Sequence, residues 1–262
     1  MGADIFTMGV DVGSTASKCL ILKNGKEIAG SAVVPAGTGT SGPGRVVAAA
    51  LAEAGIGRED VAFVTATGYG RNTFPGADAV VSELSCHAAG AHALFPEART
   101  VIDIGGQDAK VLRLDPEGRL ETFVMNDKCA AGTGRFLEVM ARVLELEVGE
   151  LGAHDAAAAR AAEISSTCTV FAESEVISQL AAGEEIDAVV AGIHNSVAVR
   201  TASLIRRLGL TEPAVMTGGV ARNGGVRRAL EQELGIRLLV SPLCQLNGAY
   251  SAAIHGRKKA KG

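Results

Sequence analysis

The stretch Asp11-Val-Gly-Ser-Thr-Ala-Ser-Lys18 decides the fold, because it forms a polar turn between apolar runs. The run 5–12 precedes it and the runs 18–23 and 27–34 follow it, with Asn24-Gly25 between the last two as a strong hairpin signal. A second stretch, Asp103-Ile-Gly-Gly-Gln-Asp-Ala-Lys110, repeats this layout among apolar runs at 100–104, 109–114 and 120–125. The sequence therefore predicts a duplicated set of three strands. Each set has an acid near the end of its first strand and a lysine on its second.

Helical patterns follow each set of strands, and short strands alternate with them. The expected helices span residues 45–54 and 83–95 in the first half, and 134–146, 170–182, 186–208 and 225–234 in the second. Further strands are expected at 61–67, 214–217 and 237–241. We therefore expect an α/β protein of duplicated βββαβα units with two lobes, residues 1–98 and 99–262. Residues 257–261 are expected to form a solvated basic tail.

Composition excludes several kinds of protein. Of the 262 residues, 47% are hydrophobic and 21% charged, which is ordinary for a globular protein. Only 3% are aromatic and the net charge is −4, so a nucleic-acid partner is not expected. The sequence shows no secretory signal and no apolar stretch of membrane-spanning length. We therefore expect a cytoplasmic protein without a membrane partner.

The turns carry groups that suit a nucleotide and its metal ion. Gly, Ser and Thr in a turn between antiparallel strands can direct backbone N–H and hydroxyl groups at a phosphate. Asp11 and Asp103 can hold Mg²⁺ through water, because hard cations take oxygen ligands. Two such turns together predict a clamp for the β- and γ-phosphates. The stretch Met216-Thr-Gly-Gly-Val-Ala-Arg-Asn-Gly-Gly225 follows a short strand, and its paired glycines would let adenosine lie against bare backbone.

Two other phosphate-binding motifs are not supported. The pattern G-x-x-x-x-G-K-[ST] is absent from the sequence, so a P-loop enzyme is excluded. Gly37-Thr-Gly-Thr-Ser-Gly42 fits the dinucleotide pattern G-x-G-x-x-G. However, it follows the third strand of a meander and no acid ends the next strand, so we do not expect a dinucleotide there.

Two of the five cysteines suit a metal site. Cys129 and Cys168 each lie just before a helical pattern, among small and polar residues. A helix N-terminus carries partial positive charge and free N–H groups, which favour thiolates. A cubane cluster needs four thiolates, which two copies of this chain would supply symmetrically. Cys19, Cys86 and Cys244 are expected to be ordinary buried residues.

The three glycine-containing turns, in this order, resemble the ATPase superfamily of actin and the sugar kinases, which has a two-lobed ribonuclease-H-like fold. More specifically, the chain resembles the activators (component A) of 2-hydroxyacyl-CoA dehydratases, above all those of (R)-2-hydroxyglutaryl-CoA dehydratase. This ATPase family also includes subunits of benzoyl-CoA reductase. Besides the stretches already quoted, the resemblance rests on Ala66-Thr-Gly-Tyr-Gly-Arg-Asn72, Ser82-Glu-Leu-Ser-Cys-His-Ala88, Asn126-Asp-Lys-Cys-Ala-Ala-Gly-Thr-Gly-Arg-Phe-Leu137 and Ile164-Ser-Ser-Thr-Cys-Thr-Val-Phe-Ala-Glu-Ser-Glu-Val176.

The resemblance implies a homodimer with one [4Fe–4S] cluster held by Cys129 and Cys168 of both subunits. It implies that ATP binding changes the angle between the helices that begin near these cysteines. The activator would take an electron from ferredoxin or flavodoxin and pass it to the dehydratase at much lower potential. The setting implied is the fermentation of amino acids by anaerobes.

Roles at the nucleotide follow from the turns and the resemblance together. Asp11 and Asp103 are expected to order water on Mg²⁺, and Gln107 to orient the attacking water; capping of a turn is the simpler alternative for the two acids. The residues expected to cradle phosphate are Ser14, Thr15, Ala16, Ser17, Lys18, Gly105 and Gly106, and those expected to flank adenosine are Gly218, Gly219 and Gln245. His87 and His194 are expected to be packed or solvated residues. Arg71 and Arg135 are expected to contact phosphate or a partner, or to form surface ion pairs.

Three rival functions stay open from the sequence. One is the ATPase subunit of a benzoyl-CoA reductase. Another is a metabolite kinase of the same superfamily, which would be free of iron. The last is an actin-like scaffold that would not use either cysteine.

Overall fold

The computed structural model describes residues 4–165 and 168–260 and divides into two compact units. The first unit comprises the chain up to Glu97, residues Pro116–Leu120 and the chain from Ser241 onward. The second comprises Ala98–Asp115 and Glu121–Val240. The chain thus returns to the first unit at its C-terminal end, whereas the expected second lobe comprises all of residues 99–262.

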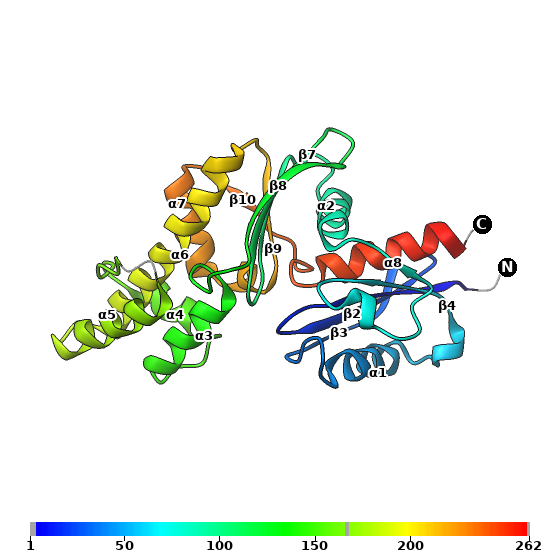
Figure 1. The fold of residues 1–262 in the computed structure, drawn as a ribbon, viewed down its shortest axis with the longest axis horizontal. Coiled ribbons are helices and arrows are strands. Elements are labelled where there is room, and N and C mark those ends of the chain that lie inside the picture. Colours follow the sequence, from blue (N-terminus) through cyan, green and yellow to red (C-terminus); the bar gives the residue numbers. More distant parts are fainter. Residues whose placement is uncertain (1–3, 166–167, 261–262) are drawn as a thin grey trace. The chain divides into compact units, whose positions relative to one another are not determined.

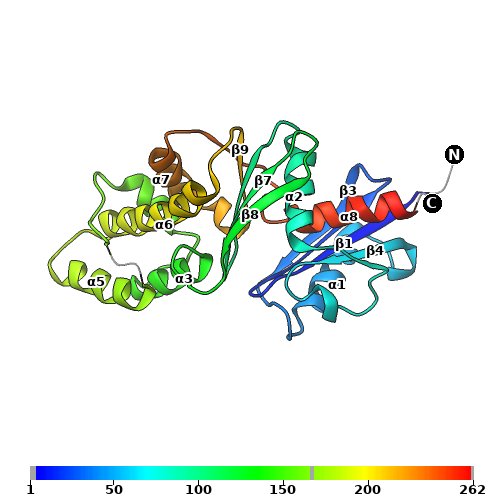
Figure 2. The same ribbon diagram turned by 45° about the horizontal axis from the view of Figure 1, so that its top comes forward.

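The first unit is built on a five-stranded sheet in the order β3-β2-β1-β4-β5. Figures 1 and 2 show its N-terminal strands, in blue, with helices on either side. Its strands are β1 (Phe6–Val12), β2 (Ser17–Lys23), β3 (Glu27–Val34), β4 (Val61–Thr67) and β5 (Ala79–Val80). The pairs β1–β2 and β2–β3 are antiparallel, while β4 is parallel to β1. Asn24 and Gly25 both have positive φ, 55° and 73°, as a type I′ hairpin turn requires. The predicted hairpin is confirmed.

Helices cover both faces of this sheet because its strands are apolar on both sides. In β2, Cys19 and Ile21 join the core under α1 (Gly42–Ala54), while the alternate residues Leu20 and Leu22 pack against α8 (Asn247–Ala260). Helix α2 (Glu83–Leu94) packs beside α8. Two short 3₁₀ helices, η1 (Arg58–Asp60) and η2 (Arg71–Thr73), complete the unit.

The second unit repeats the sheet, in the order β10-β9-β6-β7-β8. Its strands are β6 (Thr100–Ile104), β7 (Ala109–Leu114), β8 (Leu120–Asn126), β9 (Ala214–Thr217) and β10 (Leu238–Leu239). As in the first unit, the first strand has an antiparallel neighbour, β7, and a parallel neighbour, β9. Its helices are α3 (Gly134–Val143), α4 (Leu151–Ala157), α5 (Thr169–Ala181), α6 (Ile186–Leu208) and α7 (Gly224–Leu234), with η3 (Gly219–Arg222) before α7. The predicted duplication of the strands is confirmed.

The C-terminal helix α8 is the main element that sequence patterning missed. The predicted basic tail at 257–261 is solvated at Lys258 and Lys259, which are exposed, but Arg257–Lys259 form the last turn of α8 and not an irregular tail; Lys261 lies outside the described residues. The buried face of α8 consists largely of small residues such as Ala249, Ala252 and Ala253, which give no strong apolar period. Gly9 on β1 allows this helix to approach closely, since a Cβ there would lie 1.9 Å from Ala249 O.

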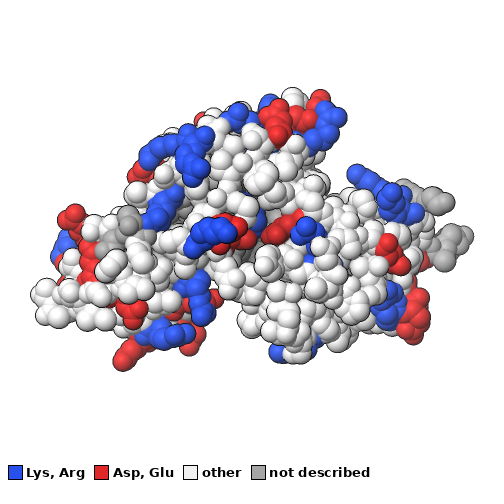
Figure 3. Space-filling model, viewed as in Figure 1, with Lys and Arg blue, Asp and Glu red and all other residues white. Residues whose placement is uncertain are grey.

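Helix α6 is long and apolar enough, by length and composition alone, to cross a membrane. However, 67% of its most apolar window is buried inside the protein, and the core helix of a soluble protein passes the same test. This helix is therefore weak evidence for a membrane span. On the face shown in Figure 3, Lys and Arg are interspersed with Asp and Glu.

Candidate active site

The first turn joins β1 to β2, and its own backbone closes it. Gly13 N donates a hydrogen bond to Ala16 O at 3.1 Å. The predicted phosphate ligands at this turn are Ser14, Thr15, Ala16, Ser17 and Lys18. Of these, Ser17 is fully buried and its hydroxyl donates to Ala36 O at 2.8 Å. The Ser17 hydroxyl therefore braces the turn from inside, while the first three residues and Lys18 are partly exposed.

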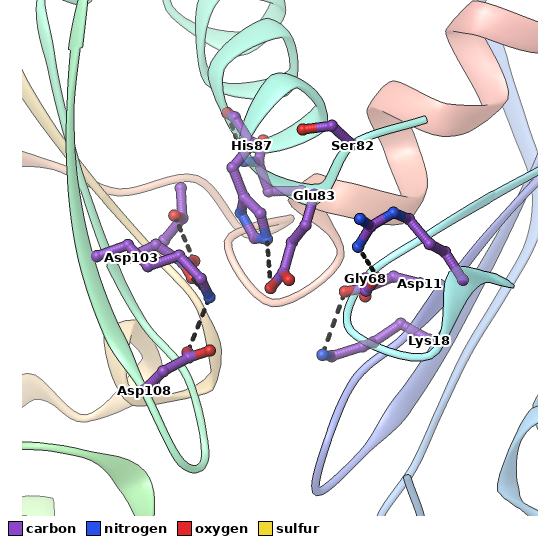
Figure 4. A network of polar contacts seen from close by, with 12 residues as sticks. Asp11, Lys18, Gly68, Ser82, Glu83, His87, Asp103 and Asp108 are labelled. Atoms are coloured by element: carbon purple, nitrogen blue, oxygen red, sulfur yellow. Dashed lines mark hydrogen bonds and ion pairs between the residues drawn. The ribbon is translucent and has the colours of Figure 1, made fainter. Parts of the chain in front are cut away.

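Asp11 lies at the end of β1, directly opposite Lys18 in the antiparallel register. Its Oδ2 is 3.2 Å from Lys18 Nζ, and the residue is only 3% exposed (Figure 4). Gly68, with φ +90°, closes over the carboxylate, because a Cβ there would lie 2.3 Å from Asp11 Oδ1. The fold thus buries this acid beside a lysine at the edge of the turn.

Helix α2 brings two further polar side chains to the first unit, and sequence reasoning assigned neither a role in chemistry. Glu83 stands in the first turn of α2, and His87 Nε2 lies 4.0 Å from Glu83 Oε1 (Figure 4). His87 is near Asp11, since a Cβ on Gly248 would lie 3.2 Å from Asp11 Oδ2 and 3.6 Å from His87 Nε2. Asn247 Nδ2 donates to His87 O at 3.0 Å and ties α8 to α2. In the sequence, Glu83 resembles an ordinary acid at a helix start, so only the fold reveals this grouping.

Asp103 occupies the corresponding place at the end of β6, with Lys110 opposite it on β7. Lys110 Nζ lies 3.5 Å from Asp103 Oδ2 and 2.8 Å from Asp108 Oδ1 (Figure 4). The hydroxyl of Thr217, on β9, donates to Asp103 Oδ1 at 2.8 Å. Asp103 and Lys110 are 2% and 3% exposed, so this unit has a fixed, buried ion pair at its turn.

The second turn is joined to the start of helix α3. Within the turn, Gly105 N donates to Asp108 O at 2.9 Å, and Gln107 is exposed at the tip. Gly134 N donates to Gly105 O at 2.9 Å, and Arg135 N donates to Gly106 O at 2.8 Å. The first two residues of α3 therefore use free helix N–H groups to bind the turn that is predicted to contact phosphate.

The predicted adenosine turn lies between β9 and α7. Gly218 has φ +89°, and a Cβ there would lie 2.3 Å from Ile104 O, so only glycine fits. Gly219 is exposed at the start of η3. Gln245, also predicted at adenosine, belongs to the first unit and lies two residues before α8.

Cys129 and Cys168 both belong to the second unit and are half-buried. Asn126 holds the loop of Cys129, accepting from Cys129 N at 3.2 Å and donating to Cys129 O at 2.8 Å. Cys168 is the N-cap residue of α5, and α5 packs against α3. Ser166 and Thr167, in the motif around Cys168, lie outside the described residues.

The other cysteines are buried, as predicted. Burial raises the pKa of the Cys19 thiol to about 12 and also raises the pKa of Cys86. These thiols are therefore poor metal ligands at neutral pH. Within residues 4–165 and 168–260, no three His, Cys, Asp or Glu side chains come together as a metal-binding group.

The model of the BadF/BadG/BcrA/BcrD ATPase family matches residues 8–256. The chain belongs to this ATPase family. An (R)-2-hydroxyglutaryl-CoA dehydratase activating ATPase from Acidaminococcus fermentans is 56% identical over 257 residues, 98% of this chain and 98% of that protein. The resemblance to dehydratase activators is therefore confirmed.

Solved structures place this ATPase in a wider fold group. The activator of the 2-hydroxyisocaproyl-CoA dehydratase from Clostridium difficile, with bound ADPNP, has a TM-score of 0.96 and 54% identity over 98% of this chain and 96% of that chain. A sugar kinase, the ROK family glucokinase from Streptomyces griseus, has a TM-score of 0.58 at 16% identity, covering 97% of this chain and 99% of its own. The second likeness shows the fold alone. The predicted two-lobed α/β fold of the actin and sugar-kinase type is confirmed.

Proposed function

We propose that the protein is an ATP-dependent activator that delivers low-potential electrons to a 2-hydroxyacyl-CoA dehydratase. The partner we favour is (R)-2-hydroxyglutaryl-CoA dehydratase. The observation that carries this proposal is the pair of hydrogen bonds from Gly134 N and Arg135 N to the Gly105-Gly106 turn. They join the turn that is proposed to bind phosphate to α3, the helix that follows Cys129. The names of the related activators and the ADPNP in one of their structures supply the reaction class and the nucleotide.

ATP or ADP would bind through both turns and the glycine pair after β9. Backbone groups of Ser14 to Ala16 and of Gly105 and Gly106, with the Lys18 ammonium, suit the phosphates. Gly218 and Gly219 suit adenosine, with Gln245 beside it. Asp11 and Asp103 suit water molecules of a Mg²⁺ ion, which would neutralise charge on the phosphates. Gln107, at the exposed tip of its turn, is suited to orient the attacking water.

Cys129 and Cys168 would hold half of a [4Fe–4S] cluster, and a second copy of the chain the other half. The fit rests on the donor set: two half-buried thiols in one unit, one in a braced loop and one at a helix N-terminus. Val170 and Phe171, directly after Cys168, are 66% and 69% exposed, and Ile177 is 52% exposed. An exposed apolar strip of this kind is typical of a surface that another protein covers. A bound cluster would supply one-electron chemistry.

ATP would act on the cysteines through α3. Phosphate contacts that shift the 105–108 turn would pull on Gly134 and Arg135, and thereby on the loop that Asn126 holds around Cys129. Such a movement would alter the N–H groups and dipoles that face the thiolates, and so the ease of reduction. The electron donor would be a ferredoxin or flavodoxin, and the location the cytoplasm.

The direct test is activation of a purified 2-hydroxyacyl-CoA dehydratase under anaerobic conditions. With a reduced ferredoxin or flavodoxin as donor, the protein should activate the dehydratase when MgATP is present and not when MgADP replaces it. Replacement of Cys129 or Cys168 by serine should abolish activation, whereas Cys86→Ala, at a buried thiol, should leave it unchanged. Phosphorylation of a sugar without any activation would contradict the proposal and favour a metabolite kinase.

A further inference from the structure

A buried polar circuit in the second unit joins three helices. His194, on α6, is fully buried and its Nδ1 lies 2.9 Å from Asp155 Oδ1, on α4. Its Nε2 lies 3.1 Å from Asn223 Nδ2, at the start of α7. Arg228, also on α7, closes the circuit by donating from Nε and Nη2 to the two oxygens of Asp155, at 2.8 and 2.7 Å.

The hydrogen bonds of Asn223 fix the proton on His194. Asn223 Oδ1 accepts from Gly225 N at 2.9 Å and from Val226 N at 3.1 Å, as an N-cap does. Its Nδ2 must therefore be the group that faces His194, which leaves Nε2 of the imidazole as acceptor and Nδ1 as donor to Asp155. Burial acts to raise the pKa of Asp155, but the hydrogen bonds from His194 and Arg228 outweigh it and lower the pKa. The circuit thus holds the His194 imidazole between an ionised carboxylate and a helix cap.

This circuit fixes one end of the segment that runs from Thr217 to Asn223. The Thr217 end is fixed at β6, where Thr217 donates to Asp103 and Gly218 packs directly on Ile104. The Asn223 end is also tightly packed, because a Cβ on Gly225 would lie 2.3 Å from His194 Nδ1. The exposed Gly219 therefore lies between two fixed points.

We propose that His194 is a positioning residue for the nucleotide, acting through Asn223 to hold the Gly218-Gly219 turn in the shape that receives adenosine. This inference rests on the proposed nucleotide site. If the turn is held in its binding shape only part of the time, the apparent affinity falls by that fraction. The loss applies equally to every ligand that carries adenosine, whatever its phosphates, and it leaves the chemistry at the phosphates intact.

A neighbouring pair provides the matched control. His154, on α4, also bonds an aspartate on α6, with Nδ1 2.6 Å from Asp187 Oδ1. Both pairs join the same two helices by the same chemistry, but within residues 4–165 and 168–260 it is His194 that bonds the Asn223 amide. His154→Gln therefore removes a His–Asp pair between α4 and α6 without touching the adenosine turn.

The test compares binding of ADP and ATP by calorimetry on the full-length protein, prepared anaerobically. We expect His194→Gln to raise Kd for both nucleotides by the same factor, about tenfold, the size of losing one buried hydrogen bond. Turnover at saturating ATP should stay within about twofold of the wild type, since only positioning is lost. His154→Gln should leave both Kd values within about twofold.

A second variant covers the case in which His194→Gln does not fold. Asn223→Ser keeps an N-cap oxygen for α7 but removes the amide that faces His194, so it should raise both Kd values in the same way. A folded Asn223→Ser protein with wild-type affinity for ADP and ATP would overturn the inference, as would an effect on ATP alone. Absence of nucleotide binding by the wild-type protein would instead refute the proposed function.

Discussion

The two units build the same local site from different supports. In each, an aspartate at the end of the first strand faces a lysine on the antiparallel neighbour and a threonine on the parallel one: Asp11 with Lys18 and Thr67, and Asp103 with Lys110 and Thr217. In each, a glycine of positive φ follows the threonine, Gly68 at 90° and Gly218 at 89°. The duplication visible in the sequence thus extends to the pairing of individual side chains.

The difference lies in what holds each turn and each acid. In the first unit, the Ser17 hydroxyl holds the turn by bonding Ala36 O, and the Thr67 hydroxyl lies against the Cys86 thiol. In the second, Thr217 bonds Asp103, and the turn also bonds the first residues of α3. We infer that the first unit provides an anchor for phosphate, while the second passes any movement of its turn to the helix beyond Cys129.

The largest effect should come from neutralising the two acids. Asp11→Asn and Asp103→Asn should each lower the turnover of MgATP by about 100-fold or more, because in the proposed function each acid supplies charge that would organise the metal ion and its water. Asp103→Asn should lower Tm by more than Asp11→Asn, because Asp103 also accepts a hydrogen bond from Thr217 and its lysine side chain is 3% exposed, whereas that of Lys18 is 18% exposed. Steady-state ATPase assays and thermal unfolding measure both quantities. Equal loss of Tm in the two variants would contradict the difference between the units.

A smaller effect should come from cutting the link between the second turn and α3. Arg135→Pro removes the N–H that bonds Gly106 O, and proline is tolerated in the first turn of a helix. We expect activation of the dehydratase to fall about tenfold, within the usual range of coupling between sites, while ATP hydrolysis changes by less than about threefold.

Arg135→Ala is the matched control, because it removes the same side chain and keeps the N–H. It should leave activation and hydrolysis near wild type, since the ion pair of Arg135 with Glu138 is exposed and contributes little. If alanine and proline reduced activation equally, the Arg135 side chain would be contacting a partner and the proposed backbone link would be wrong.

Sequence patterning could predict the elements whose signals are local. The alternation of apolar residues, the Asn24-Gly25 turn and the repeated Asp–Lys spacing were enough for both sheets. Helix α8 could not be predicted because small residues fill its buried face and give no hydrophobic period. Its tight packing on Gly9 is therefore visible only in the structure.

Contacts between distant residues were beyond such patterns. His194 meets Asp155 and Asn223 across 39 and 29 residues, and in the sequence it stands alone in a helical pattern. Likewise, Glu83 and His87 become candidate site residues only because α8 places Gly248 against Asp11. The folded geometry, and not composition, gives these groups their partners.

The central claim is that Cys129 and Cys168 from two copies of the chain hold one cluster, and iron analysis of the anaerobically purified protein tests it most directly. Combined with the molecular mass in solution, the measurement should give about four irons for every two chains, and serine at either cysteine should remove the iron while ADP still binds. An iron-free protein, or full iron content in a monomer or in either serine variant, would contradict the account.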